Sequence, residues 1–392
     1  MSENFRIIQP YNNKLKYFQL LLIPLFLVGF ESISFLVSDI GAQQSNITIL
    51  YRALFVFICL FVICTSSIKK RIFSQNFTLF IFWILYLFRG LYDSTLNQDA
   101  VKEMILMYWL FAFFLAFVPM IAVMSTINKR SLIEAKKVFF VLAIFVNVLS
   151  LINNVSALLD GSIIRYMSNQ IINSITYGQL GLALVIVAFS YFIESEKKLK
   201  NVYLIFILLG LINIALAASR GPFVQLVIVI LFYVLCNIKN FKFRYLIFLP
   251  ILFYFFFNEY DDLIKISNVI DRLQSTSFEE ERINIYLESW NRFLENPIFG
   301  SRAIGEWAHN IFLGSLEALG IIGLILITFI YKNSFKRAIT LVKINSTNWL
   351  ALLLVAYLVS ALITGGIWNS LKLWPLIAIV SNLYYNKQLY YD

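Results

Sequence analysis

The sequence predicts an all-α integral membrane protein, a polytopic bundle of about twelve transmembrane helices with one larger outer (periplasmic) loop containing an amphipathic helix. Hydrophobic residues make up 60% of the 392 residues, and charged residues make up 14%, far below the ~25% of soluble domains. The mean hydropathy is +0.78. Apolar runs of roughly 20 residues, long enough to cross a bilayer as helices, recur along the chain. These observations indicate a single polytopic membrane domain over residues 1–392.

The apolar runs give the predicted spans in order. The ninth run is short, and Lys372 and Pro375 interrupt the last one. The one long extramembrane segment is residues 259–306. We place the spans near residues 15–38, 47–66, 73–91, 103–125, 137–158, 174–193, 201–218, 222–237, 244–258, 307–331, 348–365 and 370–386.

The loop charges predict the orientation, because Lys and Arg accumulate in short cytoplasmic loops. If the N-terminus is inside, most of the 32 Lys and Arg residues fall on the cytoplasmic side, and the alternation is uninterrupted. Both termini are then cytoplasmic, and residues 259–306 are on the outer side. The net charge of +10 is explained by this topology, so no nucleic-acid partner is required.

The outer segment contains an amphipathic helix of its own. Ser277-Phe278-Glu279-Glu280 fits a capping box, and Asn296-Pro297 ends the helix. Such a helix would lie on the outer membrane surface or fold over a cavity mouth. At 100° per residue, Arg282 falls on the flank of the apolar stripe and can face the protein, whereas Arg292 points away from the stripe and is expected to face water. The stripe consists of Ile283, Tyr286, Leu287, Trp290, Phe293 and Leu294.

Charges at membrane depth normally pair or line a pathway. Arg220 lies in the tight turn Ser219-Arg220-Gly221-Pro222, where it points into a polar cavity or toward lipid headgroups. Arg165, in the outer loop before the sixth span, has the same two interpretations. Glu31 and Arg52 lie at similar depth in neighbouring spans, and we expect them to form a buried ion pair rather than a catalytic site.

His309 is the only histidine, and it lies where the charged outer segment meets the apolar run that starts at Ile311. Imidazole has an unperturbed pKa of about 6.5 and can exchange a proton near neutral pH. One interpretation of His309 is a general base, and the other is an interfacial residue that caps the following span. No nucleotide-binding or metalloprotease motif is present, and one histidine without a nearby cysteine makes zinc improbable, so no metal or cofactor is expected. One base and several arginines suit displacement of a phosphate leaving group by a hydroxyl.

Six segments of the second half of the chain form a recognisable series of motifs. They are Tyr177-Gly178-Gln179-Leu180 after Arg165, Ser219-Arg220-Gly221-Pro222, Arg282 with Trp290, Asn296-Pro297-Ile298-Phe299-Gly300, Ala308-His309-Asn310-Ile311-Phe312-Leu313 and Glu317-Ala318-Leu319-Gly320-Ile321-Ile322-Gly323-Leu324. In the same order, these segments resemble the superfamily of O-antigen polymerases (Wzy-type) and O-antigen ligases. The resemblance covers residues 160–330 well, and the first half of the chain only through its span count. Gly300-Ser301-Arg302 departs from the Gly-x-Gly often found after the Pro-Ile-Phe stretch.

The resemblance implies transfer of a glycan from undecaprenyl pyrophosphate to a sugar hydroxyl at the outer leaflet of the bacterial inner membrane, without a metal. Arg165, Arg220 and Arg282 would hold the pyrophosphate, and His309 would accept or orient the proton of the attacking hydroxyl. Asn310 would support this site. Glu317, two turns deeper, is expected to pair within the bundle rather than take the proton.

We predict a polymerase that extends a lipid-linked O-antigen or capsule polysaccharide, working with membrane lipid, a chain-length regulator and a flippase. The closest alternative is the ligase that transfers the glycan to lipid A core. A third alternative, from another class, is a flippase or other transporter of lipid-linked oligosaccharides. Transporters tend to carry their charged residues near the bilayer midplane. Here the charges cluster at the outer edge, which favours surface chemistry.

Overall fold

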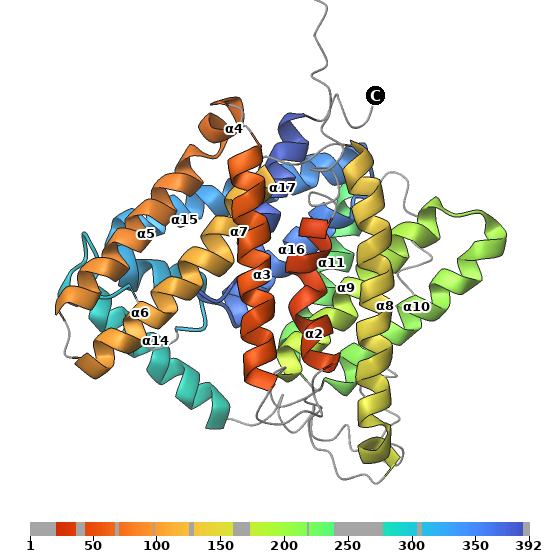
Figure 1. Ribbon diagram of the computed structural model, residues 1–392, viewed down its shortest axis with the longest axis horizontal. Helices are drawn as coiled ribbons and strands as arrows, with labels where there is room; N and C mark the ends of the chain where they lie inside the picture. The colour runs from red at the N-terminus through yellow and green to blue at the C-terminus, as the bar shows by residue number, and fades with distance from the viewer. Residues whose placement is uncertain are drawn as a thin grey trace, which may run out of the picture.

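A computed structural model describes residues 21–36, 44–66, 70–96, 99–124, 129–159, 173–217, 219–238, 277–303 and 308–386. All regular elements in these ranges are helical, and the helices form one bundle (Figure 1). They are η1 (Leu25–Gly29), α2 (Phe30–Leu36), α3 (Gln44–Thr65), α4 (Lys70–Gln75), α5 (Phe77–Leu96), α6 (Asp99–Phe111), η3 (Ala112–Phe117), α7 (Val118–Met124), α8 (Lys129–Leu159), α9 (Ser174–Glu194), α10 (Lys197–Leu216), α11 (Arg220–Cys236), α14 (Ser277–Glu295), α15 (Ile311–Ile344), α16 (Trp349–Ile363) and α17 (Leu373–Tyr385).

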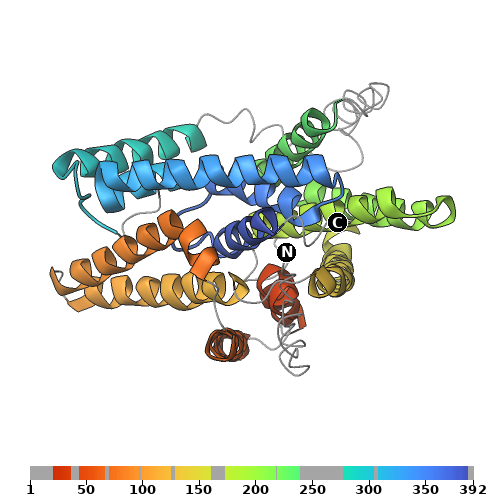
Figure 2. The same ribbon diagram turned by 90° about the horizontal axis from the view of Figure 1, so that it is seen from above.

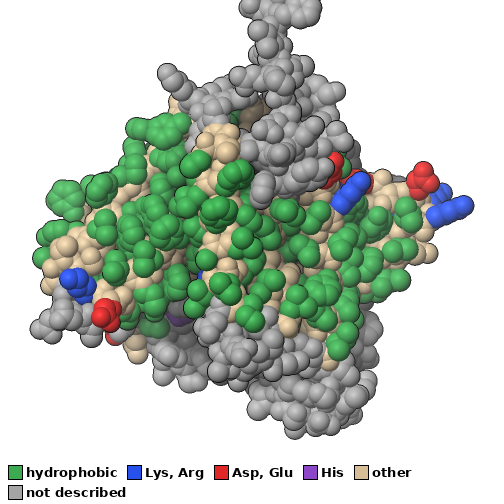
Figure 3. Space-filling model, viewed as in Figure 1, with side chains coloured by type: hydrophobic (Ala, Val, Ile, Leu, Met, Phe, Trp, Pro, Cys, Tyr) green, Lys and Arg blue, Asp and Glu red, His purple; other side chains and the backbone are tan. Residues whose placement is uncertain are grey.

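The helices fit a multi-pass membrane protein. Seven stretches in the described residues are long and apolar enough to cross a bilayer, and four shorter apolar helices accompany them. Hydrophobic side chains cover most of the face shown in Figure 3, and charged side chains lie at its margins. The predicted membrane class is therefore confirmed, but the count of twelve is not. The ninth predicted span, 244–258, lies outside the described residues.

A buried polar network joins α8, α9 and α10 inside the bundle. The hydroxyl of Tyr177 donates to Asn213 Oδ1 at 2.7 Å, and Asn213 Nδ2 donates to Asn147 Oδ1 at 2.6 Å. Polar side chains with no water nearby stay inside a membrane bundle only when they satisfy one another. The network fixes α9, whose N-terminal end contributes to the polar region described below.

Helix α15 changes direction sharply at Gly320, whose φ of 62° is not helical. The segment that follows α14 crosses the helix there, and the Ile321 amide donates to the Pro297 carbonyl at 2.9 Å. A Cβ on Gly320 would lie 2.4 Å from the Ile298 carbonyl oxygen, and one on Gly300 would lie 2.4 Å from the Ala318 carbonyl carbon. Both positions therefore require glycine. The crossing places Gly300 beside Ala318 of α15.

Helix α14 confirms the amphipathic helix that the capping box predicted, and it lies beside α15 (Figure 2). The prediction that Arg292 faces water is wrong. Its Nη1 pairs with Glu317 Oε1 of α15 at 2.9 Å, whereas the apolar stripe is exposed at Ile283, Leu287 and Trp290. Glu317 is buried and needs a cation, so the polar side of α14 turns inward. The apolar side is left exposed.

The ion pair predicted between Glu31 and Arg52 is also wrong. Glu31 Oε1 pairs instead with Lys372 Nζ at 2.5 Å, from the connection between α16 and α17. The guanidinium of Arg52 lies over the rings of Phe30 and Phe111, at 4.8 and 5.4 Å from the centroids. Cation-π contacts satisfy this charge. Depth along two neighbouring spans could not reveal that a distant connection folds in beside α2.

Candidate functional site

The N-terminal ends of α9, α11 and α15 meet the C-terminal end of α16 and the connection that follows it, residues 364–372, at one end of the bundle. Asn310 Nδ2, at the start of α15, donates to the Leu362 carbonyl at 3.1 Å. A Cβ on Gly221, at the start of α11, would lie 3.8 Å from Thr364 Cγ2. A Cβ on Gly178 in α9 would lie 2.6 Å from Pro222 Cγ. Three helix N-termini, each with a partial positive charge, therefore gather in one region.

His309 lies in this region with an unusual backbone. It is half-buried, and its φ of 48° is the only positive value of a non-glycine residue among those described. The side chain of Asn310, not of His309, caps α15, because it accepts from the amides of Phe312 and Leu313 at 2.9 and 3.2 Å. The interpretation of His309 as the helix cap is therefore wrong. Strained backbone held by its surroundings is typical of functional positions.

Arg220 is the first residue of α11 and is half-buried. It makes no hydrogen bond or ion pair with the residues that the structure describes, although other half-buried arginines such as Arg337 do. A guanidinium in this position is available to a phosphate. Arg165 lies outside the described residues, and for Arg282 only the backbone in α14 is described, so their predicted contacts with pyrophosphate remain predictions.

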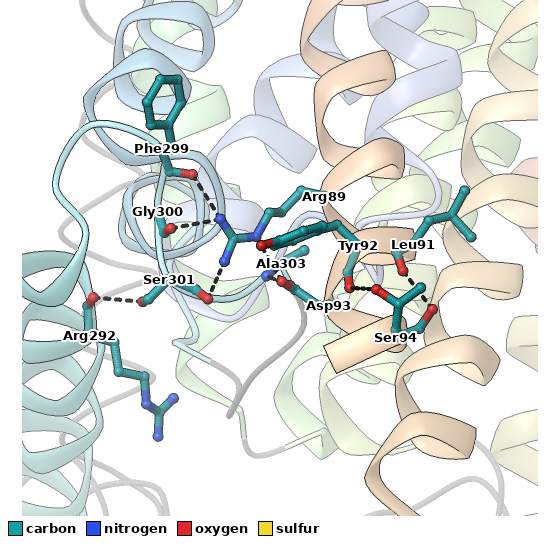
Figure 4. Close-up of polar contacts among 11 residues, drawn as sticks. Arg89, Leu91, Tyr92, Asp93, Ser94, Arg292, Phe299, Gly300, Ser301 and Ala303 are labelled. Atoms are coloured by element: carbon teal, nitrogen blue, oxygen red, sulfur yellow. Dashed lines mark hydrogen bonds and ion pairs between the residues drawn. The ribbon is translucent and has the colours of Figure 1, made fainter. Parts of the chain in front are cut away.

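Arg89 and Asp93 of α5 hold the segment that leads to His309 (Figure 4). Arg89 Nη1 donates to the Gly300 carbonyl at 2.8 Å, its Nη2 donates to the Ser301 carbonyl, and its Nε pairs with Asp93 Oδ1 at 2.8 Å. Asp93 Oδ2 accepts from the Ala303 amide at 2.6 Å. We call these contacts of Arg89 and Asp93 with residues 299–303 the loop clamp. The clamp fixes one side of the loop before His309.

Glu317 and Arg292 fix the other side of the same loop. The pairing expected for Glu317 is present, and its partner is Arg292. The Ser301 and Arg302 amides donate to the Glu317 carbonyl at 2.9 and 3.2 Å, and Ser301 Oγ donates to the Arg292 carbonyl at 2.6 Å. The loop is therefore bonded to α5, α14 and α15. Glu317 is a positioning residue in this arrangement.

Arg89 and Asp93 were not among the residues predicted from the sequence, although their spacing carries a signal. They lie four residues apart in the predicted span 73–91 and just after it, at a spacing that places them on one helix face. An Arg and an Asp so close within an apolar helix indicate an internal ion pair. Their contact with a loop some 210 residues away could not be read from this spacing.

Arg89→Lys is expected to loosen the loop clamp. A lysine ammonium is a single point of charge and cannot replace the planar fork that reaches Asp93 and two carbonyls at once. We expect a loss of about 2 kcal/mol in stability, the scale of one charged hydrogen bond, and a fall in activity of at least tenfold. Thermal unfolding in detergent and glycan extension in membranes measure the two effects. Lys102→Ala, exposed on α6, is the control. A fully active Arg89→Lys protein would show that the clamp does not position His309.

The described residues contain no group of three His, Cys, Asp or Glu side chains that could hold a metal. The polar region instead offers a guanidinium at a helix N-terminus and an imidazole on a neighbouring segment. An arginine can bind an anionic leaving group, and an imidazole can accept the proton of an attacking hydroxyl. This combination can carry out group transfer from a phosphate ester.

The apolar helices of the bundle are those of a multi-pass membrane protein. Residues 204–328, from α10 into α15, match the family model of O-antigen ligase. The match contains Arg220, His309 and Glu317, and over this part of the chain it supports the resemblance to O-antigen ligases and polymerases. No curated protein matches the chain.

The match implies an enzyme of ligase or polymerase type that acts on a lipid-linked glycan. It gives no support to the alternative of a flippase. The first half of the chain, including α5 with Arg89 and Asp93, lies outside the matched residues.

Proposed function

We propose that this protein polymerises a lipid-linked polysaccharide, an O-antigen or a capsule. It transfers an undecaprenyl-pyrophosphate-linked glycan to a sugar hydroxyl of another lipid-linked repeat unit at the outer leaflet of the bacterial inner membrane. One observation carries this proposal: Arg220 and His309 both fall within the family match and lie at the same end of the bundle. Arg220 is at a helix N-terminus, and His309 has a strained backbone.

In this reaction Arg220 binds the pyrophosphate, together with Arg282 and Arg165. Each such ion pair contributes about 4 kcal/mol at 4 Å in an effective dielectric of ~20, before the cost of desolvation. The acceptor hydroxyl oxygen forms a bond to the anomeric carbon, and the bond from that carbon to the phosphate oxygen breaks. The electron pair leaves with undecaprenyl pyrophosphate, and His309 takes the hydroxyl proton. No ATP is consumed, because the lipid pyrophosphate already activates the sugar.

The proposed reaction requires the polar end of the bundle to face the outer side, with both termini cytoplasmic as the loop charges predict. The glycan-bearing lipid then reaches the site from the outer leaflet. A chain-length regulator and a flippase are the expected partners, one to set the number of repeats and the other to supply the lipid-linked units.

The second candidate function is ligation of the finished glycan to lipid A core. The description of the matching family model, O-antigen ligase, favours it. The donor and the bond that breaks are the same in both reactions, and only the acceptor differs. The contacts of Arg220 and His309 serve either reaction.

Deletion of the gene, followed by gel analysis of surface lipopolysaccharide and of the lipid-linked pool, separates these functions. Loss of a polymerase should leave a single repeat unit on each core. Loss of a ligase should leave bare core and accumulated lipid-linked polymer, which would contradict our choice. Complementation with Arg220→Ala should reproduce the deletion pattern. A normal ladder in the deletion strain would contradict both functions.

A further inference from the structure

A cavity of about 280 Å³ lies beside the polar end of the bundle, between α2, α9, α16 and the connection of residues 364–372. Thr364 belongs to its wall, and a Cβ on Gly221, the residue next to Arg220, would lie 3.8 Å from Thr364 Cγ2. The cavity therefore adjoins the region that holds the proposed pyrophosphate site. Its size is close to the lower end of the ~300–1,000 Å³ range of small-ligand pockets.

A buried carboxylate in the cavity wall has an unused acceptor. Glu31 is 3% exposed, and its Oε1 accepts from Lys372 Nζ at 2.5 Å. Its Oε2 has no hydrogen-bond partner among the residues that the structure describes. An unsatisfied buried acceptor costs free energy, about 1–3 kcal/mol and more for a charged group, so it is expected to meet a donor when the protein works.

The remaining polar wall is fixed in place. Gln179 Nε2 donates to Ser360 Oγ at 2.7 Å, and Asn369 Oδ1 accepts from the Gly366 amide at 2.6 Å. The rings of Phe30 and Tyr357 complete the wall with apolar surface. Amide, hydroxyl and carboxylate groups beside aromatic rings match the two sides of a sugar, whose hydroxyl groups donate and accept while its C–H faces pack on rings.

The charges of the wall select against an anion. Lys372 is neutralised by Glu31, both residues line the cavity, and Glu31 keeps a second carboxylate oxygen, Oε2, without a partner among the described residues. A pyrophosphate would be repelled by that oxygen, whereas a sugar hydroxyl can donate to it in a charge-assisted hydrogen bond. The neighbouring Arg220 provides the contrasting site for the anion.

We propose that this cavity binds one sugar residue of the lipid-linked glycan, with Glu31 Oε2 accepting from a sugar hydroxyl and Lys372 holding the carboxylate in place. The inference rests on the proposed function and deepens it, because it assigns the glycan and the pyrophosphate to separate, adjacent sites. Glu31 and Lys372 lie outside the part of the chain that the family model matches.

The test measures binding of two probes to the purified full-length protein by titration calorimetry in detergent. One probe is the repeat-unit oligosaccharide released from the lipid carrier of the source strain, and the other is inorganic pyrophosphate. Glu31→Gln should weaken binding of the oligosaccharide at least tenfold and leave binding of pyrophosphate unchanged. Arg220→Ala should show the reverse pattern.

Two further variants keep the test decisive if the Glu31→Gln protein does not fold. The double variant Glu31→Gln/Lys372→Met leaves no charge unpaired, and Thr176→Phe fills the cavity from its α9 wall without touching the ion pair. Both should lose the oligosaccharide and retain pyrophosphate. Glu194→Gln breaks a different ion pair, with Lys136, at the other end of α9, and should bind both probes normally.

The outcomes separate the two proposals. If the wild-type protein extends glycans in proteoliposomes but the cavity variants bind the oligosaccharide as tightly as it does, the sugar site is wrong and the proposed function stands. The same conclusion follows if the oligosaccharide does not bind the wild-type protein, or if the cavity variants lose pyrophosphate instead. If the wild-type protein binds the oligosaccharide yet transfers no glycan to any acceptor, the proposed function is wrong and the sugar site stands.

Discussion

Replacing His309 with alanine is expected to abolish glycan extension while the protein stays in the membrane. A positioned general base contributes typically 10²–10⁴-fold to a rate, and His309 is the only histidine in the chain, so no other imidazole can take over the proton. Complementation of a deletion strain and gel analysis of the glycan ladder provide the first measurement. Initial rates of extension in proteoliposomes give the size of the effect.

The control for this prediction concerns the backbone of His309, whose φ is 48°. Asparagine tolerates this left-handed conformation better than most residues, so His309→Asn should fold as stably as the wild-type protein and still be inactive. If His309→Asn or His309→Ala extends glycans at the wild-type rate, His309 is not the base. A thermal unfolding curve for each variant separates lost chemistry from lost structure.

Arg292→Ala is expected to be the most destabilising change of a charged residue in the outer segment. It removes the cation that pairs with Glu317 at 2.9 Å and leaves a carboxylate buried near the start of α15. Removing one partner of a buried ion pair costs about 3–5 kcal/mol, and because Arg292 is partly exposed we expect about 3 kcal/mol. The midpoint of thermal unfolding in detergent should fall, and extension should fall with it because the loop before His309 loses an anchor.

The control lies on the same helix. Glu295 is exposed on α14, and Glu295→Ala should change neither stability nor activity. The double variant Arg292→Met/Glu317→Met removes both charges and should recover much of the stability that Arg292→Ala loses. An Arg292→Ala protein as stable as the wild type would show that Glu317 finds another cation.

Several of the helical spans were predictable from the sequence because apolar periodicity and length are local properties, although the count of twelve is not confirmed. The spans near 47–66, 174–193 and 348–365 correspond to α3, α9 and α16 within a few residues. Tertiary contacts were harder to predict. Arg292 turned inward because the need of buried Glu317 for a cation outweighs the direction that the apolar stripe indicates.

The candidate site was predictable only in part, for a related reason. Motif order placed Arg220 and His309 in one family pattern, and the structure brings their segments to one end of the bundle. Arg89, Asp93 and the pair of Glu31 with Lys372 act across more than two hundred residues. Spacing along a chain carries no information on such contacts.

Gly300 and Gly320 lie where the segment after α14 crosses α15, and a substitution at one position affects the space available at the other. A side chain at either one would collide with the backbone of the other's segment, so no small backbone shift at one position relieves the other. A lineage that lost one glycine would have to rebuild both the loop path and the bend of α15. The two glycines should therefore be kept or lost together among related chains, as one inherited unit.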